Sequence, residues 1–239
     1  AGLAYQKSRI PRVPDFYHQR IQRCVSSCNC ACLDENSPSA NLFSRPLYIT
    51  LARVARPNFR PSLIGSDLTV RIAIISDIHA NLPALEAVLH HIDGQQVDKI
   101  YCLGDTVGYG GKPVECVERV RADCDGSVIG NHDEAVALNE GAEFLPRDGQ
   151  VAAALHRSLL SEEDLAWLAE RPKVLVADGV TFVHAAPQEP QTWLRIESLQ
   201  EAQEQFQHFE TDFCLIGHTH VAGVIGNKIG VLRVRPGYR

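Results

Sequence analysis

RIAIISDIHANLPALEAVL, residues 71–89, decides the fold of this 239-residue chain. It opens with RIAIISD, a continuous apolar run that ends in polar residues, which is typical of a buried central strand. Asn81 can then cap a helix that has Pro83 in its first turn, and apolar residues follow at helical spacing. A buried strand that runs directly into an amphipathic helix indicates the α/β class.

The same alternation continues along the chain. Further buried strands are predicted at KIYCLGD (99–105), SVIGN (127–131) and DFCLIGH (212–218). Asp178-Gly179, between KVLVA and VTFVHA, is a strong β-hairpin signal, and a last hairpin is expected to turn at Gly226-Asn227. Strands that alternate with helices and then form hairpins predict an α/β sandwich.

Residues 1–69 differ from the rest of the chain. They are rich in proline and arginine and show no sustained period of 2 or 3.6 residues. Four cysteines lie within residues 24–32, whereas structural zinc sites usually bring two separated pairs together. A targeting peptide is a second alternative, but a clear apolar core is missing. We therefore expect a disordered or non-native extension over 1–69 and one domain over 70–239.

Charge and cysteine usage restrict the partners of this domain. Residues 70–239 carry fourteen Lys and Arg against twenty-five Asp and Glu, and stable nucleic-acid binding, which needs a basic face, is not expected. No apolar run approaches the length of a membrane span, so no membrane partner is expected. The cysteines of this part are single and lie in apolar or helical stretches, as expected of reduced packing residues in a cytoplasmic protein.

Potential metal ligands follow five of the predicted strands. They are Asp77 and His79, Asp105, Asn131, His184, and His218 with His220. Each fragment alone is a weak signal, but ligands gather at the carboxyl ends of strands in open α/β sheets. Five such fragments in order therefore predict a metal site. Imidazole and carboxylate without thiolate suit borderline divalent ions.

These motifs resemble the calcineurin-like metallophosphoesterases, whose pattern is D-x-H, G-D, G-N-H-D/E, H and G-H-x-H. The match covers about residues 71–237 and is most similar to a small bacterial branch related to diadenosine tetraphosphatases and short phosphodiesterases. The resemblance implies a four-layer αββα sandwich with two central sheets. The family continues through an Asn-Pro-Gly-Ser turn into further strands, so the fold is expected to lack its last C-terminal strands.

The resemblance also implies two metal positions that share a carboxylate. The first would be held by Asp77, His79 and His220, the second by Asn131, His184 and His218, and both by Asp105. Mn²⁺ is the expected ion, with Fe²⁺, Ni²⁺ or Zn²⁺ as alternatives. His132 would face the leaving-group oxygen and not a metal. Asp133 either orients that imidazole as a second catalytic residue or only caps the following helix.

Two other features have alternative interpretations. The glycine run at 108–111 lacks the Lys-Ser/Thr of a P-loop and is expected to be an active-site loop with unusual backbone angles. Trp193, in the loop after His184, either stacks on a nucleobase or packs within the fold.

The predicted function is hydrolysis of a phosphodiester, a dinucleoside polyphosphate or a phosphomonoester by a hydroxide that two metal ions activate. A small phosphorylated molecule is the expected partner. Ala185-Ala186 stand where the family commonly has Gly-Ser, which leaves substrate preference and oligomeric state open. Two alternatives remain: a non-catalytic, metal-binding interaction scaffold of the same fold, and an inactive fragment.

Overall fold

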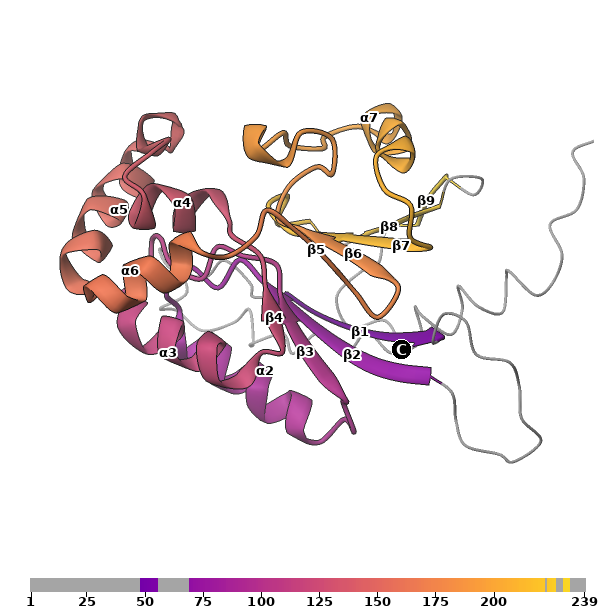
Figure 1. Cartoon of the computed structure of the whole chain (residues 1–239), viewed down its shortest axis with the longest axis horizontal. Coiled ribbons are helices and arrows are strands. Elements are labelled where there is room, and N and C mark those ends of the chain that lie inside the picture. Colours follow the sequence, from indigo (N-terminus) through magenta and orange to yellow (C-terminus); the bar gives the residue numbers. More distant parts are fainter. Residues whose placement is uncertain (1–47, 56–68, 222, 227–229, 233–239) are drawn as a thin grey trace, which may run out of the picture.

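A computed structural model describes residues 48–55, 69–221, 223–226 and 230–232 of the chain (Figure 1). Its first sheet has the strand order β1-β2-β3-β4. The strands are β1 (Tyr48–Ala55), β2 (Thr69–Ser76), β3 (Lys99–Cys102) and β4 (Gly126–Ser127). β2, β3 and β4 run parallel, as their separation by helices predicts, and β1 pairs antiparallel with β2 at the edge.

β1 lies inside the segment for which the sequence predicts only an extension. It pairs with β2 from Tyr48 opposite Ser76 to Ala55 opposite Thr69. Its sequence, YITLARVA, is rich in β-branched and apolar residues, but the Pro- and Arg-rich flanks conceal so short a pattern. The expectation for 1–47 and 56–68, including the cysteine cluster, concerns residues outside the described part of the chain.

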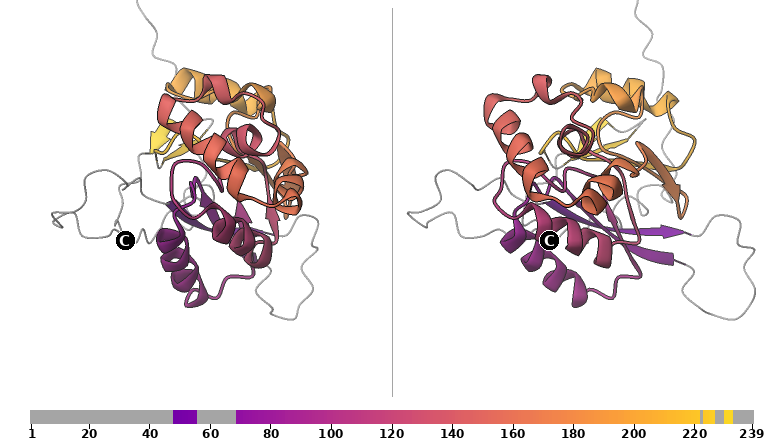
Figure 2. Two further views of the ribbon diagram at one scale, coloured as in Figure 1. Left: turned by 90° about the vertical axis from the view of Figure 1, so that its left-hand side faces the viewer. Right: turned by 60° about the vertical axis from the view of Figure 1, so that its left-hand side comes forward.

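Helices cover the outer face of this sheet and close one end of the molecule. They are α2 (Leu82–Asp93), α3 (Pro113–Asp123), α4 (Asn131–Ala137), α5 (Arg147–Leu159) and α6 (Glu162–Ala169), with a short 3-10 turn, η1 (Ala142–Phe144). The Asn81 side chain caps α2 by accepting from the Ala84 N–H. Figure 2 shows these helices beside the sheet from two further sides. Ala73 and Ile75 of β2 pack against α2 and α3.

A second sheet faces the first. It contains β5 (Val174–Ala177), β6 (Val180–Val183) and β7 (Phe213–Ile216), and it is followed by a hairpin of β8 (Val224–Gly226) and β9 (Gly230–Leu232). The β5–β6 turn is at Asp178-Gly179, as predicted. Ile72 and Ile74, on the opposite face of β2 from Ala73, pack against Phe182 of β6. Successive residues of one strand therefore fill two core layers.

The last helical elements complete the architecture. They are the 3-10 turns η2 (Pro190–Thr192) and η3 (Gln205–Gln207) and the helix α7 (Leu199–Glu204). α7 lies on the outer side of the second sheet (Figure 1). The order of layers is thus helices, sheet, sheet, helix, which confirms the predicted αββα sandwich. The expected lack of C-terminal strands concerns residues outside the described part and stays an expectation.

Among the described residues, no helix combines the length and the apolar character needed to cross a membrane.

The contact between the sheets should dominate stability. Phe182 is 1% exposed and stacks on Tyr101 with ring centroids 4.4 Å apart. We expect Phe182→Ala to lower the free energy of unfolding by about 3–5 kcal/mol in urea denaturation, because it leaves a cavity between the sheets. The control is Val176→Ala at a site 62% exposed, where the change should stay within about 0.5 kcal/mol. Equal effects of the two substitutions would contradict this packing.

Candidate metal centre

The side chains predicted to hold metal converge where the loops after β2, β3, β4, β6 and β7 meet. Three groups of His and Asp side chains have ligand atoms within 4.8 Å of one another. The groups are Asp77, His79 and His220; His79, Asp105 and His132; and Asp105, His184 and His218. The structure thus brings the widely separated sequence motifs to one place.

Backbone hydrogen bonds join these loops to one another. The Asp77 N–H donates to Gly104 O at 3.1 Å, the His79 N–H to Asp105 O at 2.8 Å, and the Gly217 N–H to His184 O at 2.8 Å. Several candidate ligands adopt left-handed backbone angles, namely Asp77, His79, Asp105, His218 and His220. Such angles are costly outside glycine and cluster at functional sites, because surrounding contacts must enforce them.

Asp105 occupies the middle of the cluster. Its side chain is buried, and Oδ1 accepts a hydrogen bond from the His132 N–H at 2.9 Å. Oδ2 lies 3.3 Å from His184 Nε2 and 3.7 Å from His79 Nε2. Burial alone would raise the pKa of Asp105, but the imidazoles of His184 and His132 hold it well below the usual range. The carboxylate therefore stays ionised between two histidines.

The first group surrounds Asp77. His220 Nε2 lies 2.9 Å from Asp77 Oδ1 and 3.2 Å from His79 Nε2. The Ser76 hydroxyl donates to Asp77 Oδ2 at 2.6 Å, which fixes the carboxylate. His79 Nδ1 lies 3.2 Å from Val107 O, a carbonyl that can only accept, so this nitrogen carries the proton. The lone pair of His79 Nε2 then faces the group, as in histidines that bind metal.

The second group surrounds His184. Its Nδ1 donates to Leu103 O at 2.7 Å, so its Nε2 is the nitrogen that faces the group and would bind a metal in place of its proton. That atom lies 3.2 Å from Asn131 Oδ1 and 3.2 Å from His218 Nδ1, besides Asp105 Oδ2. Burial lowers the pKa of His184, but the Asp105 and Asp77 carboxylates and the hydrogen bond to Leu103 O together raise it to about 9. The carboxylates around His184 Nε2 thus stabilise a positive charge at this place.

The two groups fit divalent cations. Their inward atoms are carboxylate and amide oxygens and imidazole nitrogens, and these acceptors repel one another unless a proton or a metal cation lies among them. Nitrogen and oxygen ligands without sulfur suit borderline divalent ions. Backbone carbonyls also orient His79 and His184, which is the usual support of metal-binding histidines.

His132 lies beside both groups. Its ring is 4% exposed, and ring centroids lie 4.9 Å from His79 and 4.6 Å from Tyr109. His132 Nδ1 is buried without a hydrogen-bond partner in the described structure. Burial lowers the pKa of His132, although the Asp105 carboxylate opposes this. Whether His132 contacts metal or only substrate stays a prediction.

Asp133 adopts a capping role at the start of α4. Oδ1 accepts from the Val107 N–H at 3.0 Å and Oδ2 from the Gly130 N–H at 3.1 Å. Neither oxygen is hydrogen-bonded to the His132 ring, because a residue at the third position of α4 points back toward the helix start. Whether Asp133 acts with His132 in catalysis stays a prediction. Burial raises the pKa of Asp133 to about 7.

His156 is a residue of this region that the sequence analysis missed. Its Nδ1 accepts from the Gly108 N–H at 3.0 Å, and its Nε2 donates to Gly110 O at 2.8 Å. This holds the glycine loop, which has the expected unusual angles: φ is 99° at Gly108 and 54° at Tyr109. A Cβ at Gly108 would lie 2.6 Å from His132 Nδ1, so only glycine fits. The sequence signal that could have indicated a buried His156 is its place on the same face of α5 as the small residues Gly149, Ala152 and Ala153.

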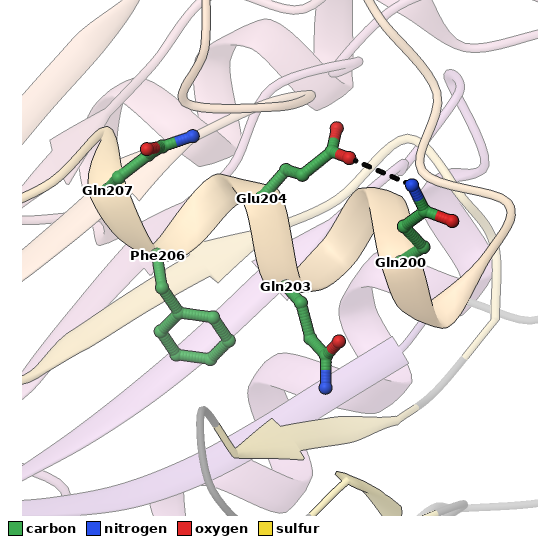
Figure 3. A pocket seen from close by; sticks show the side chains of 5 residues that line it. All are labelled: Gln200, Gln203, Glu204, Phe206 and Gln207. Atoms are coloured by element: carbon green, nitrogen blue, oxygen red, sulfur yellow. Dashed lines mark hydrogen bonds between the residues drawn. The ribbon is translucent and has the colours of Figure 1, made fainter.

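A separate cavity of about 370 Å³ lies along α7 and η3 (Figure 3). It is lined by Gln200, Gln203, Glu204, Phe206 and Gln207. None of these is a candidate ligand, and amides with a single carboxylate do not form a metal site.

A family model described as a calcineurin-like phosphoesterase superfamily domain matches residues 70–238. The chain belongs to this superfamily. It is 37% identical over 154 residues to the uncharacterized protein MJ0912 of Methanocaldococcus jannaschii, a match that covers 63% of this chain and 62% of that protein. The chain therefore spans less than two thirds of the length of this relative.

Solved structures agree with this membership. The chain resembles a metallophosphoesterase from Sphaerobacter thermophilus with a TM-score of 0.61 and 39% identity, over 71% of this chain and 70% of that one. It resembles the hypothetical protein PH1004 from Pyrococcus horikoshii with a TM-score of 0.54 and 19% identity, over 63% and 69% of the two chains. The second likeness shows the fold alone.

Metal binding should stabilise the folded chain through Asp105. We expect Mn²⁺ at a concentration of about 100 times its Kd to stabilise the wild type by about 2.7 kcal/mol, seen as a higher Tm by calorimetry. Asp105→Asn should lose most of this shift, because it removes the negative charge between the groups. The matched control is Glu170→Gln at a side chain 74% exposed, which should keep the full shift. A full shift in Asp105→Asn would contradict the site.

Proposed function

We propose that this chain is a metal-dependent phosphoesterase with a dinuclear centre, acting on a phosphodiester, a dinucleoside polyphosphate or a phosphomonoester. The observation that carries the proposal is the Asp105 carboxylate, whose Oδ2 lies between His79 Nε2 and His184 Nε2. One shared carboxylate between two ligand groups suits a pair of divalent ions. Membership of the superfamily supports the same chemistry.

The residues divide into two ligand sets. Asp77, His79 and His220 would hold one ion, Asn131, His184 and His218 the other, and Asp105 both, with Mn²⁺ as the proposed metal. Two such ions would supply Lewis-acid chemistry, which activates water and neutralises charge on phosphate oxygens. Asn131 contributes a neutral oxygen, so only two ligand carboxylates offset the charge of the ions. The remaining positive charge attracts an anionic phosphate group.

His132 is the proposed proton donor to the leaving group. Its Nδ1 packs against the Gly108 backbone, which leaves Nε2 as the atom that can exchange a proton with substrate. Because Asp133 does not contact the ring, the neighbour that supplies negative charge to His132 is Asp105. We therefore assign Asp133 to the support of the loop and the helix start, and His132 alone to proton transfer.

The proposed substrate is a small phosphorylated molecule, and the proposed location of the protein is the cytoplasm. Cys102, Cys116, Cys124 and Cys214 are free thiols in the described structure, as is common in reducing compartments. The acidic composition of residues 70–239 favours a small substrate over a nucleic-acid partner.

Hydrolysis of bis-p-nitrophenyl phosphate and p-nitrophenyl phosphate tests the function. With Mn²⁺ we expect turnover that chelation abolishes and that Asp105→Asn removes. His132→Ala should keep the Mn²⁺-dependent rise in Tm but lose about 10²–10⁴ in kcat. His90→Ala, at an exposed position of α2, is the control and should leave kcat unchanged.

The outcomes separate the alternatives. Unchanged turnover in His132→Ala would remove this residue from the mechanism. A folded, metal-loaded wild type without turnover on either substrate would contradict the enzyme and favour the interaction scaffold.

A further inference from the structure

The loop after β6 is fastened to α4 through a tryptophan. Trp193 has left-handed backbone angles, with φ 56° and ψ 33°. Its indole N–H donates to Glu134 Oε2 at 2.8 Å, and the Ala186 N–H closes the loop by donating to Leu194 O at 3.3 Å. A residue held at such angles needs external contacts, and the bond to Glu134 provides one.

Lys173 completes a three-residue cluster. Its ammonium group pairs with the other oxygen of Glu134 and lies 4.4 Å from the Trp193 ring centroid. The Glu134 side chain is only 13% exposed and that of Lys173 33%, so water weakens these contacts less than at an open surface. The neighbouring Pro172 accepts a hydrogen bond from the Ile129 N–H at 3.0 Å, which fixes the backbone beside Lys173.

The cluster touches the candidate ligands of one ion only. The Trp193 ring packs edge-on against His184, with centroids 5.9 Å apart and an interplanar angle of 74°. Glu134 lies one turn along α4 from Asn131, whose Oδ1 is 3.2 Å from His184 Nε2. No hydrogen bond, ion pair or ring contact joins the cluster to Asp77, His79 or His220 in the described structure.

We propose that Trp193, Glu134 and Lys173 form a clamp that positions His184 and Asn131 and so sets the affinity of the second metal position. The inference rests on the proposed dinuclear centre. The indole links the loop after β6 to α4. Its ring packs against the side of His184, and its N–H binds Glu134 on the helix that starts at Asn131. Trp193 is therefore a positioning residue. Of the two interpretations of Trp193, this one corresponds to packing within the fold, because Lys173 covers one face of the ring and His184 lies at its edge.

The clamp predicts a selective loss of affinity. Removal of a partner that orients a metal ligand typically weakens metal binding by about 10–100-fold. Trp193→Phe keeps an aromatic ring but loses the donor to Glu134. Mn²⁺ at the second position, that of Asn131, His184 and His218, should therefore bind about 10–100-fold more weakly. The first Mn²⁺ should bind as in the wild type, because its ligands do not touch the clamp. Glu134→Gln keeps an acceptor for the indole but removes the charge that pairs with Lys173, and it should give a smaller loss of the same kind.

Calorimetric titration of the metal-free full chain with Mn²⁺ tests this, together with the Tm of the metal-free form. The chain has two tryptophans, so Trp167→Phe is the matched control: Trp167 packs under Arg171 at 4.6 Å and lacks contact with the candidate ligands. In that background Trp193 is the single tryptophan, and its fluorescence should be quenched as Co²⁺ fills the second position. Trp167→Phe itself should leave both Mn²⁺ affinities unchanged.

Three results would overturn the proposal. Unchanged affinity for the second Mn²⁺ in Trp193→Phe would exclude the clamp. Equal weakening of both Mn²⁺ steps with a lower Tm of the metal-free form would reduce Trp193 to a general stabiliser. A wild type that binds a single Mn²⁺ would instead contradict the dinuclear centre on which the clamp depends.

Discussion

The buried carboxylate of Asp105 is the constraint on which the rest of the structure depends. It keeps its negative charge in a position that is 1% exposed, anchored through Oδ1 and directed through Oδ2 at two imidazoles. A charge in such a place is tolerated only with opposite charge close by. The loops after β2, β6 and β7 bring the histidines, and the parallel strands bring those loops to one edge of the sandwich. The arrangement of the strands therefore also places the imidazoles that stabilise the buried charge of Asp105.

Several hydrogen bonds around the candidate ligands hold them in place. Leu103 and Val107 carbonyls fix the tautomers of His184 and His79, and Asp133 ties the start of α4 to the glycine loop. His156 pins the same loop from α5. These contacts enforce the left-handed angles of the ligand residues, which local sequence alone disfavours. Strain at the centre is thus offset by hydrogen bonds around it.

Much of the fold and the ligand positions could be predicted because the signals are local. Apolar runs that end in Asp77 or His184 mark strands and their ends, and Asp178-Gly179 marks a hairpin. β1 could not be predicted, since an edge strand gains its place by pairing with β2, and its own pattern is short. The contacts of His156 with Gly108 and of Trp193 with Glu134 join residues 48 and 59 positions apart, and no periodic pattern announces them. The role of Asp133 depended on the direction of one side chain, which spacing does not reveal.

The location of the ions tests the central claim most directly. Anomalous diffraction from crystals grown with Mn²⁺ would show how many ions bind and which side chains hold them. The account predicts two peaks about 3.5–4 Å apart, both in contact with the Asp105 carboxylate, with Asn131 on one of them and His132 on neither. A single peak, or one bound by His79, Asp105 and His132 together, would contradict it.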